Sequence, residues 1–104
     1  MSQYAAPLRD VRFTIEEVLN YGDHLDTLSS GGEADLDLMT AIVEEAGKFA
    51  EQEVAPLYQI GDSEGCRLED GNVKTPTGFR EAYSKYIENG WPSISGDPEF
   101  GGQG

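Results

Sequence analysis

The fold is decided by one stretch, DLDLMTAIVEEAGKFAEQEVAPLY, at positions 35–58. Its apolar residues recur every three or four positions, which places them on one face of an α-helix. They are Leu36, Met39, Ile42, Val43, Ala46, Phe49, Ala50, Val54 and Leu57. At about 1.5 Å per residue, the pattern predicts a helix of roughly 35 Å. A helix with so wide an apolar stripe needs other elements to cover it.

Both ends of this helix carry recognisable signals. Asp35 and Asp37 are candidate N-caps, because a carboxylate there accepts hydrogen bonds from backbone N–H groups that lack a helical partner. Near the other end, Pro56 has no N–H to donate, so we expect the helix to kink or stop there.

The N-terminal part predicts a second helix. Residues 1–7 are expected to be extended, and apolar residues then recur at helical spacing from Leu8 to about Tyr21. Asn20 or Gly22 closes this helix. A further turn is expected over residues 24–28.

The middle of the chain predicts little helix. SSGGE at 29–33 indicates a flexible break, and residues 61–78 form a connection. Within that connection, CRLEDGNVKTP at 66–76 indicates a small hairpin around Asp70 and Gly71, because Asp-Gly suits a tight turn with positive φ.

A third helix is expected over residues 78–89, capped by Thr75 or Thr77 and ended by Asn89-Gly90. The tail at 91–104 is rich in proline and glycine and is expected to be loop. We therefore predict a small all-α domain over residues 1–104, with about three main helices and a hairpin-like insertion.

Composition excludes several classes of function. The chain has 20 acidic and 7 basic residues and a net charge of −13, which repels nucleic acid and anionic lipid. Leu, Ile, Val and Phe supply only 22 of the 104 residues, so the core should be thin. We expect no nucleic-acid partner and no membrane span.

The single cysteine, Cys66, rules out an internal disulfide and a zinc site built on cysteines. The N-terminal residues MSQYAAPLRD lack the pattern of a secretory signal. A reduced, cytoplasmic location is the expected one.

No residue stands out as catalytic. His24 is the only histidine, and its neighbours Asp23 and Asp26 would not face it on a helix. Arg67 lies beside Cys66 and would favour a thiolate, but the sequence places no histidine next to this thiol. We interpret His24 as a surface histidine and Cys66 as an ordinary thiol.

Other candidate sites also have simpler interpretations. The adjacent carboxylates are expected to be solvated helix faces; they are Glu16, Glu17, Glu44, Glu45, Glu51 and Glu53. The run DSEGCRLEDGNV at 62–73 has Arg67 where a calcium loop needs glycine. Ser63 is followed by Glu64 and Gly65, a poor helix start for an acyl carrier serine.

The aromatic residues Tyr83, Tyr86, Trp91 and Phe100 are compatible with a ligand cavity, and equally with a core or an interface. GGQG at 101–104 lacks the spacing of a phosphate loop. We therefore predict no catalytic, cofactor-binding or metal-ligating residue in this chain.

Three segments, in order, resemble the N-terminal end of the flavin-dependent acyl-CoA dehydrogenases. They are FAEQEVAPLYQIGDSEG (49–65), GFREAYSKYIENGW (78–91) and PSISGDPEFGGQG (92–104). YAAPLRDVRFTIEEVL (4–19) and the insertion CRLEDGNVKTPTGF (66–79) are similar to the subgroup with longer chains. The resemblance covers nearly the whole sequence.

The resemblance implies an N-terminal helical domain that packs against a middle β-domain and a C-terminal helical domain. The family oxidises the α,β bond of acyl-CoA thioesters with FAD, in a homo-oligomer, and its catalytic glutamate comes from a later domain. No glutamate here matches that position. We expect FAD only in the full-length parent, no cofactor on this chain, and a segment that walls the acyl pocket and supports assembly.

A second hypothesis is a stand-alone acidic helical module that binds another protein through its apolar stripe. Under either hypothesis, uncovered apolar stripes predict self-association or partial molten behaviour of the isolated chain.

Overall fold

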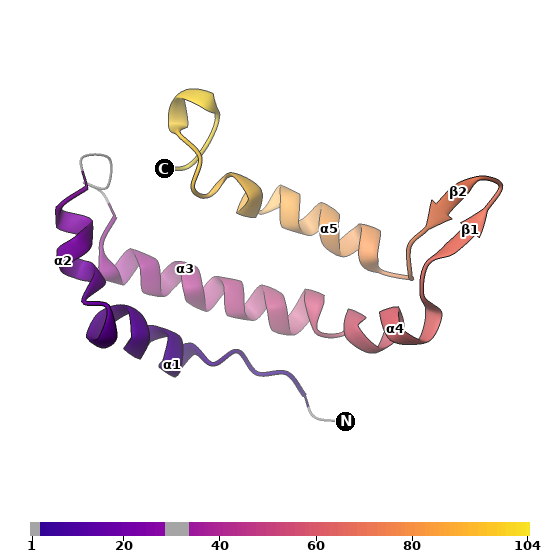
Figure 1. Cartoon of the computed structure of the whole chain (residues 1–104), viewed down its shortest axis with the longest axis horizontal. Coiled ribbons are helices and arrows are strands. Elements are labelled where there is room, and N and C mark those ends of the chain that lie inside the picture. Colours follow the sequence, from indigo (N-terminus) through magenta and orange to yellow (C-terminus); the bar gives the residue numbers. More distant parts are fainter. Residues whose placement is uncertain (1–2, 29–33) are drawn as a thin grey trace. The chain divides into compact units, whose positions relative to one another are not determined.

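The computed structural model describes residues 3–28 and 34–104, which belong to two compact units, Met1–Glu51 and Gln52–Gly104. Helices make up most of the described residues, with one two-stranded sheet (Figure 1). The prediction of an all-α domain with a small hairpin is confirmed. The predicted break at 29–33 lies outside the described residues, as do the first two residues of the predicted extended segment.

The first unit begins with the helix predicted from Leu8, which ends slightly earlier than the expected position near Tyr21. α1 (Leu8–Phe13) continues into the π-helical turn η1 (Thr14–Val18), in which the N–H of Leu19 donates to the carbonyl of Thr14 at 2.9 Å. Asn20 then adopts a left-handed φ of 47° and ends the helix. α2 (Tyr21–Asp26) follows and contains the turn that was predicted around His24.

α3 (Leu36–Phe49) is the main helix of the first unit, and its predicted start is confirmed. The Asp35 carboxylate accepts from the N–H of Leu38 at 2.8 Å. α3 packs closely on the N-terminal segment at Gly47, where an added Cβ would lie 3.1 Å from the Cβ of Ala6. The N–H of Ala6 also donates to Glu51 Oε1 at 2.8 Å.

The predicted interruption of the helix at Pro56 is confirmed, and the stretch 35–58 is not one regular helix. The α-helix passes into a π-helical turn, η2 (Ala50–Val54), and ends before Pro56, which has no N–H for the helical ladder. A new helix, α4 (Leu57–Glu64), starts directly after this proline. Residues 61–64 are therefore helical, whereas the sequence predicted a connection there.

The predicted hairpin is confirmed in the second unit. β1 (Arg67–Glu69) and β2 (Asn72–Lys74) pair antiparallel, with Leu68 opposite Val73. Asp70 and Gly71 form the turn with φ values of 51° and 79°, as a two-residue turn with two positive φ angles requires.

α5 (Phe79–Glu88) ends at Asn89-Gly90 as predicted, with a φ of 82° at Gly90. The predicted threonine cap is wrong, because Gly78 occupies the N-cap position with a left-handed φ of 89° and no side chain caps the helix. Thr77 makes a different contact, described below.

The tail is not all loop, as was predicted, because it contains two short 3₁₀ turns, η3 (Trp91–Ser93) and η4 (Pro98–Phe100). The Gln103 side chain donates to the carbonyl of Gly90 at 2.7 Å and to Ser93 Oγ at 3.1 Å. Gly102 lies so close to Gly96 that an added Cβ would overlap the Gly96 carbonyl.

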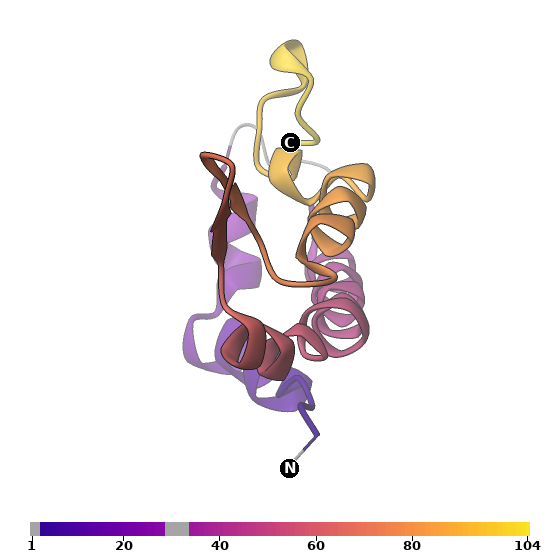
Figure 2. The same ribbon diagram turned by 90° about the vertical axis from the view of Figure 1, so that its right-hand side faces the viewer.

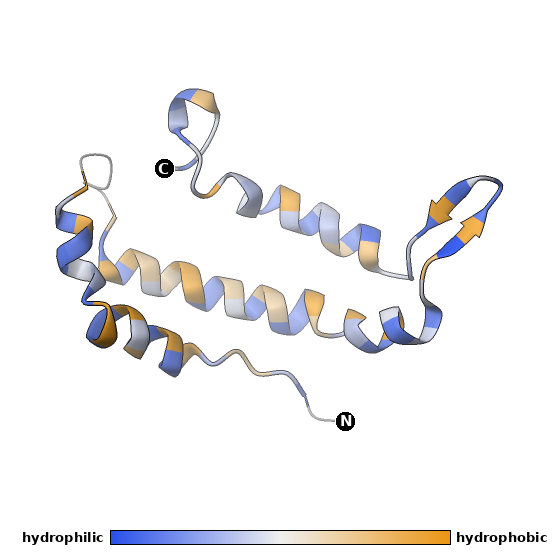
Figure 3. Ribbon diagram, in the orientation of Figure 1, coloured by the Kyte–Doolittle hydropathy of each residue, from blue (hydrophilic) through white to orange (hydrophobic). Residues whose placement is uncertain are grey.

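The core is thin, as the composition indicated. Among the described residues, Leu25 is the one large apolar side chain that is buried, with 8% of its surface exposed. Apolar positions recur on every helix in Figure 3, yet many of the large ones are exposed. Of the helices in the described part of the chain, none is both long and apolar enough to cross a membrane.

Candidate functional site: the clasped hairpin

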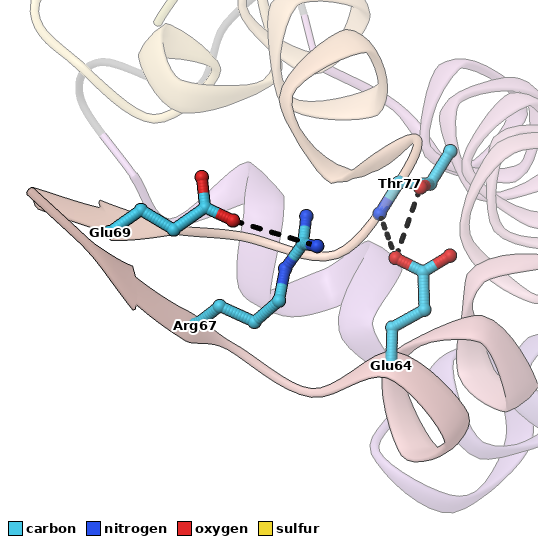
Figure 4. A network of polar contacts seen from close by, with 4 residues as sticks. All are labelled: Glu64, Arg67, Glu69 and Thr77. Carbon is cyan, nitrogen blue, oxygen red and sulfur yellow. Dashed lines mark hydrogen bonds and ion pairs between the residues drawn. The ribbon is translucent and has the colours of Figure 1, made fainter.

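The most organised polar contact of the second unit lies at the base of the hairpin. Glu64 is the last residue of α4, and its Oε2 accepts from the backbone N–H of Thr77 at 2.9 Å and from Thr77 Oγ1 at 3.0 Å (Figure 4). These two hydrogen bonds lower the pKa of Glu64 below its ordinary value, and the nearby Arg67 adds to the effect. We call this contact the Glu64–Thr77 clasp.

Glycines allow α4 and the start of α5 to approach closely beneath the clasp. An added Cβ on Gly61 would lie 2.8 Å from Cζ of the Phe79 ring, and one on Gly78 would lie 2.8 Å from Cδ2 of Leu57. Pro76, just before the clasp, is buried. The two ends of the hairpin segment are therefore held by packing as well as by hydrogen bonds.

The hairpin itself is exposed along its whole length and projects from the end of α4 and α5 in both views (Figure 2). Side chains alternate between the two faces of a strand. Leu68 and Val73 share one face, with 75% and 68% of their surface exposed. Arg67 and Lys74 lie opposite each other on the other face. There, Arg67 Nη1 also lies 3.7 Å from Glu69 Oε1.

The first unit contains a shallow apolar groove of about 240 Å³ between α1, η1 and α3. Its apolar lining comprises Leu8, Val11, Ile15, Met39 and Val43. The ion pair of Arg12 Nε with Glu16 Oε1, at 3.0 Å, also borders the groove. The lining suits an apolar group, and Thr40 and Glu44 also border it.

His24 and Cys66 belong to different units, and each is exposed within its own. His24 is exposed on α2 with its ring 4.9 Å from that of Tyr21, and the Asp23 carboxylate accepts instead from Asn20 Nδ2 at 2.7 Å. Cys66 is exposed directly before β1.

The paired carboxylates lie on helices, and four of them each bond to one partner, with Glu16 accepting from Arg12 Nε at 3.0 Å. Glu45 accepts from Lys48 Nζ at 3.0 Å and Glu53 from Lys85 Nζ at 2.9 Å. Glu51 accepts from the N–H of Ala6. Within residues 3–28 and 34–104, no three His, Cys, Asp or Glu side chains are grouped to hold a metal ion.

Ser63 lies near the end of α4 and does not open a helix, as an acyl carrier serine would. The sequence resembling a calcium loop is divided between the end of α4 and the hairpin.

Two of the aromatic side chains of the second unit contact each other on α5. The rings of Tyr83 and Tyr86 stack with centroids 6.2 Å apart on α5, and Phe100 is 84% exposed. The indole N–H of Trp91 is buried and has no hydrogen-bond partner among the described residues.

Sequence reasoning missed the clasp. Thr77 was identified as a candidate cap, so its hydroxyl was expected to bond within α5. Helix caps are local, whereas Glu64 lies 13 residues away. The one available signal was the pair of glycines at 65 and 78, which allow sharp turns on either side of the hairpin with φ values of 63° and 89°.

The sequence comparison shows that the chain is similar to an acyl-CoA dehydrogenase. One relative is the 3-methylmercaptopropionyl-CoA dehydrogenase of Ruegeria pomeroyi, which is 43% identical over 101 residues, or 97% of this chain. The resemblance inferred from the sequence is thereby confirmed. The chain spans 17% of the length of this relative. No family model matches the chain.

The cofactor that the resemblance implies for the parent is FAD. A flavin dinucleotide carries a diphosphate, which needs clustered cations or free backbone N–H groups. Four of the seven basic side chains are instead ion-paired with carboxylates of this chain; they are Arg12, Lys48, Arg67 and Lys85. The start of α3, which is the longest helix described, is already capped by Asp35.

Proposed function

We propose that this chain is the N-terminal helical part of a flavin-dependent acyl-CoA dehydrogenase and performs no chemistry by itself. The observation that carries the proposal is the 43% identity to such a dehydrogenase over nearly the whole chain. The parent would be a cytoplasmic homo-oligomer of the longer-chain subgroup and would oxidise the α,β bond of an acyl-CoA thioester. FAD and the catalytic base would be held by polypeptide outside these residues.

The thin core supports this proposal. Among the described residues, Leu25 is the one large apolar side chain that is buried, and so small a core contributes little because burial of apolar surface is the main favourable term in folding. Side chains such as Tyr58, at 80% exposure, and Phe100 would gain most from packing against further polypeptide. In the parent, the helices would help to wall the acyl pocket and to support assembly.

The proposal is tested by comparing the isolated chain with its parent. We expect the purified 104-residue chain to show no flavin absorbance and no acyl-CoA dehydrogenation. The parent should be yellow and active, and 3-methylmercaptopropionyl-CoA is the first substrate to test because the relative is named for it. A yellow, active preparation of the isolated chain would contradict the assignment.

The exposed apolar residues also favour a second candidate, a stand-alone acidic module that binds another protein. The two candidates differ in the length of the natural polypeptide. A reading frame that ends naturally after Gly104 would favour the module.

A further inference from the structure

We propose that Asp70 is a site of spontaneous isoaspartate formation, a covalent change of the main chain at the tip of the hairpin. The reaction needs only residues of this chain and water. The inference goes beyond the proposed function, and it holds for the parent enzyme and for the stand-alone module alike.

The chemistry starts from the backbone nitrogen of Gly71. This nitrogen attacks Cγ of Asp70 and forms a C–N bond, while the carboxyl OH and the amide hydrogen leave together as water. The product is a cyclic succinimide, which water opens at either carbonyl. One opening restores aspartate, and the other gives isoaspartate, in which the main chain runs through Cβ and Cγ of residue 70. Glycine favours the attack because it has no side chain to obstruct it.

The sequence offers two places for this reaction. Glycine follows aspartate or asparagine only at Asp70-Gly71 and at Asn89-Gly90. In an unfolded chain Asn89 would react first, because a neutral amide is a better electrophile than an ionised carboxylate. We expect the folded structure to reverse this order, since it holds the two backbones differently.

The backbone at Asn89-Gly90 is fixed by hydrogen bonds. The N–H of Gly90, whose nitrogen would be the nucleophile, donates to the carbonyl of Ile87 at 3.0 Å. The carbonyl of Gly90 accepts from Gln103 Nε2 at 2.7 Å and from Ser93 Oγ at 3.0 Å. An added Cβ on Gly90 would lie 2.7 Å from Gln103 Nε2, so neighbouring atoms also restrict rotation there. The end of α5 therefore protects Asn89.

The turn at Asp70-Gly71 is open by comparison. Both residues are exposed, and an added Cβ on Gly71 would meet no atom within 4 Å beyond its chain neighbours. They lie between β1 and β2, outside the paired positions. In the part of the chain that the structure describes, Asn72 Nδ2 donates to the Asp70 backbone carbonyl at 3.5 Å, and the Asp70 carboxylate has no partner. The carboxylate and the Gly71 nitrogen can therefore meet when the turn fluctuates.

Isoaspartate would disrupt the hairpin. It adds a methylene group to the main chain, so the turn loses the two-residue geometry that matches the twist of the strands. The pairing of Leu68 with Val73 depends on the register that this turn sets. The modification would thus act on the two-stranded sheet of the second unit.

The test measures both sites in the natural polypeptide that contains this chain, after several weeks at neutral pH, either folded or in guanidinium chloride. Trypsin cleaves after Arg67 and Lys74 and releases residues 68–74, whose isoaspartate form has an unchanged mass and is separated by chromatography. Conversion of Asn89 changes the mass of the peptide that begins at Tyr86. In the folded polypeptide, isoaspartate at residue 70 should exceed conversion at Asn89 severalfold. In the denaturant the order should reverse.

Two variants identify the source of the product. Asp70→Glu should abolish it, because the ring that the longer side chain would form closes far more slowly. Asp70→Asn keeps a preferred sequence for this turn and should convert severalfold faster than the natural chain. Methylation of residues 68–74 by an isoaspartyl methyltransferase gives an independent reading. Conversion of Asn89 before Asp70 in the folded polypeptide, or methylation of residues 68–74 that persists in Asp70→Glu, would overturn the inference.

Discussion

The two units of the chain are stabilised in different ways. Met1–Glu51 is stabilised by helices whose apolar residues recur every three or four positions and pack together. Leu25 is buried there, and the Asp35 carboxylate caps the start of α3. Gln52–Gly104 depends on glycines that permit close approach and on polar side chains that bridge distant positions. Gln103, for example, bonds to Gly90 and Ser93, 13 and 10 residues earlier.

This difference indicates where each unit is vulnerable. Truncation of an apolar side chain should lower the free energy of unfolding most in the first unit, because few buried contacts stabilise it. Added volume should damage the second unit most, because its glycines leave no room. Substitutions that remove or add side-chain volume in each unit test this comparison.

The largest effect is expected for Leu25→Ala. Truncating a buried leucine removes its transfer free energy and leaves a cavity, and in so thin a core we expect the lower end of the usual range, about 2 kcal/mol. Chemical denaturation followed by circular dichroism measures the change. Leu19→Ala is the control, because Leu19 is 59% exposed and its truncation should change stability little.

Gly61→Val should be the next largest. The new Cβ would lie 2.8 Å from the Phe79 ring, and overpacking of this kind costs about 1–3 kcal/mol. The loss should appear in the same denaturation experiment. Adding Phe79→Leu removes the ring atom Cζ that the new Cβ would contact, and should restore part of the stability. If stability does not recover, this contact is not the cause of the loss.

Gly47→Ala should have a much smaller effect than Gly61→Val. The added Cβ would lie 3.1 Å from Ala6 and Leu8 side chains, which requires only a small adjustment. Alanine also favours the helix interior over glycine by about 1 kcal/mol. We expect stability to change by less than about 1 kcal/mol in either direction. A loss as large as that of Gly61→Val would remove the distinction between the units.

The smallest effect is expected from titration of the clasp. The folded-state pKa of Glu64 lies below its ordinary value of 4.5, so the clasp stabilises the fold above that value. This contribution is lost as the pH falls through the lowered folded-state pKa. Denaturation midpoints measured from neutral to acidic pH should fall less steeply in Glu64→Gln than in the unaltered chain. Identical profiles would show that the clasp does not contribute.

The difference between the two units also explains which structural features could be predicted from the sequence. Periodicity and local signals were sufficient for α3, its Asp35 cap, the Asp70-Gly71 turn and the end of α5 at Asn89-Gly90. Each of these depends on residues close together in the chain, which one sequence displays directly.

The errors have two physical causes. Apolar spacing does not show how far a helix resumes after a proline, so residues 61–64 of α4 were predicted to be a connection. The Glu64–Thr77 clasp joins residues far apart in sequence, and threonine before a helix is normally a cap. That this chain contributes no catalytic residue stays a prediction, and activity measurements on the parent enzyme would test it.

The most direct test of the account is the mass of the natural polypeptide in its source cell, detected with an antibody raised against this segment. We predict a band several times larger than 11.3 kDa, as expected for one part of a multidomain dehydrogenase. A band at 11.3 kDa would contradict the account and leave the stand-alone binding module as the better explanation.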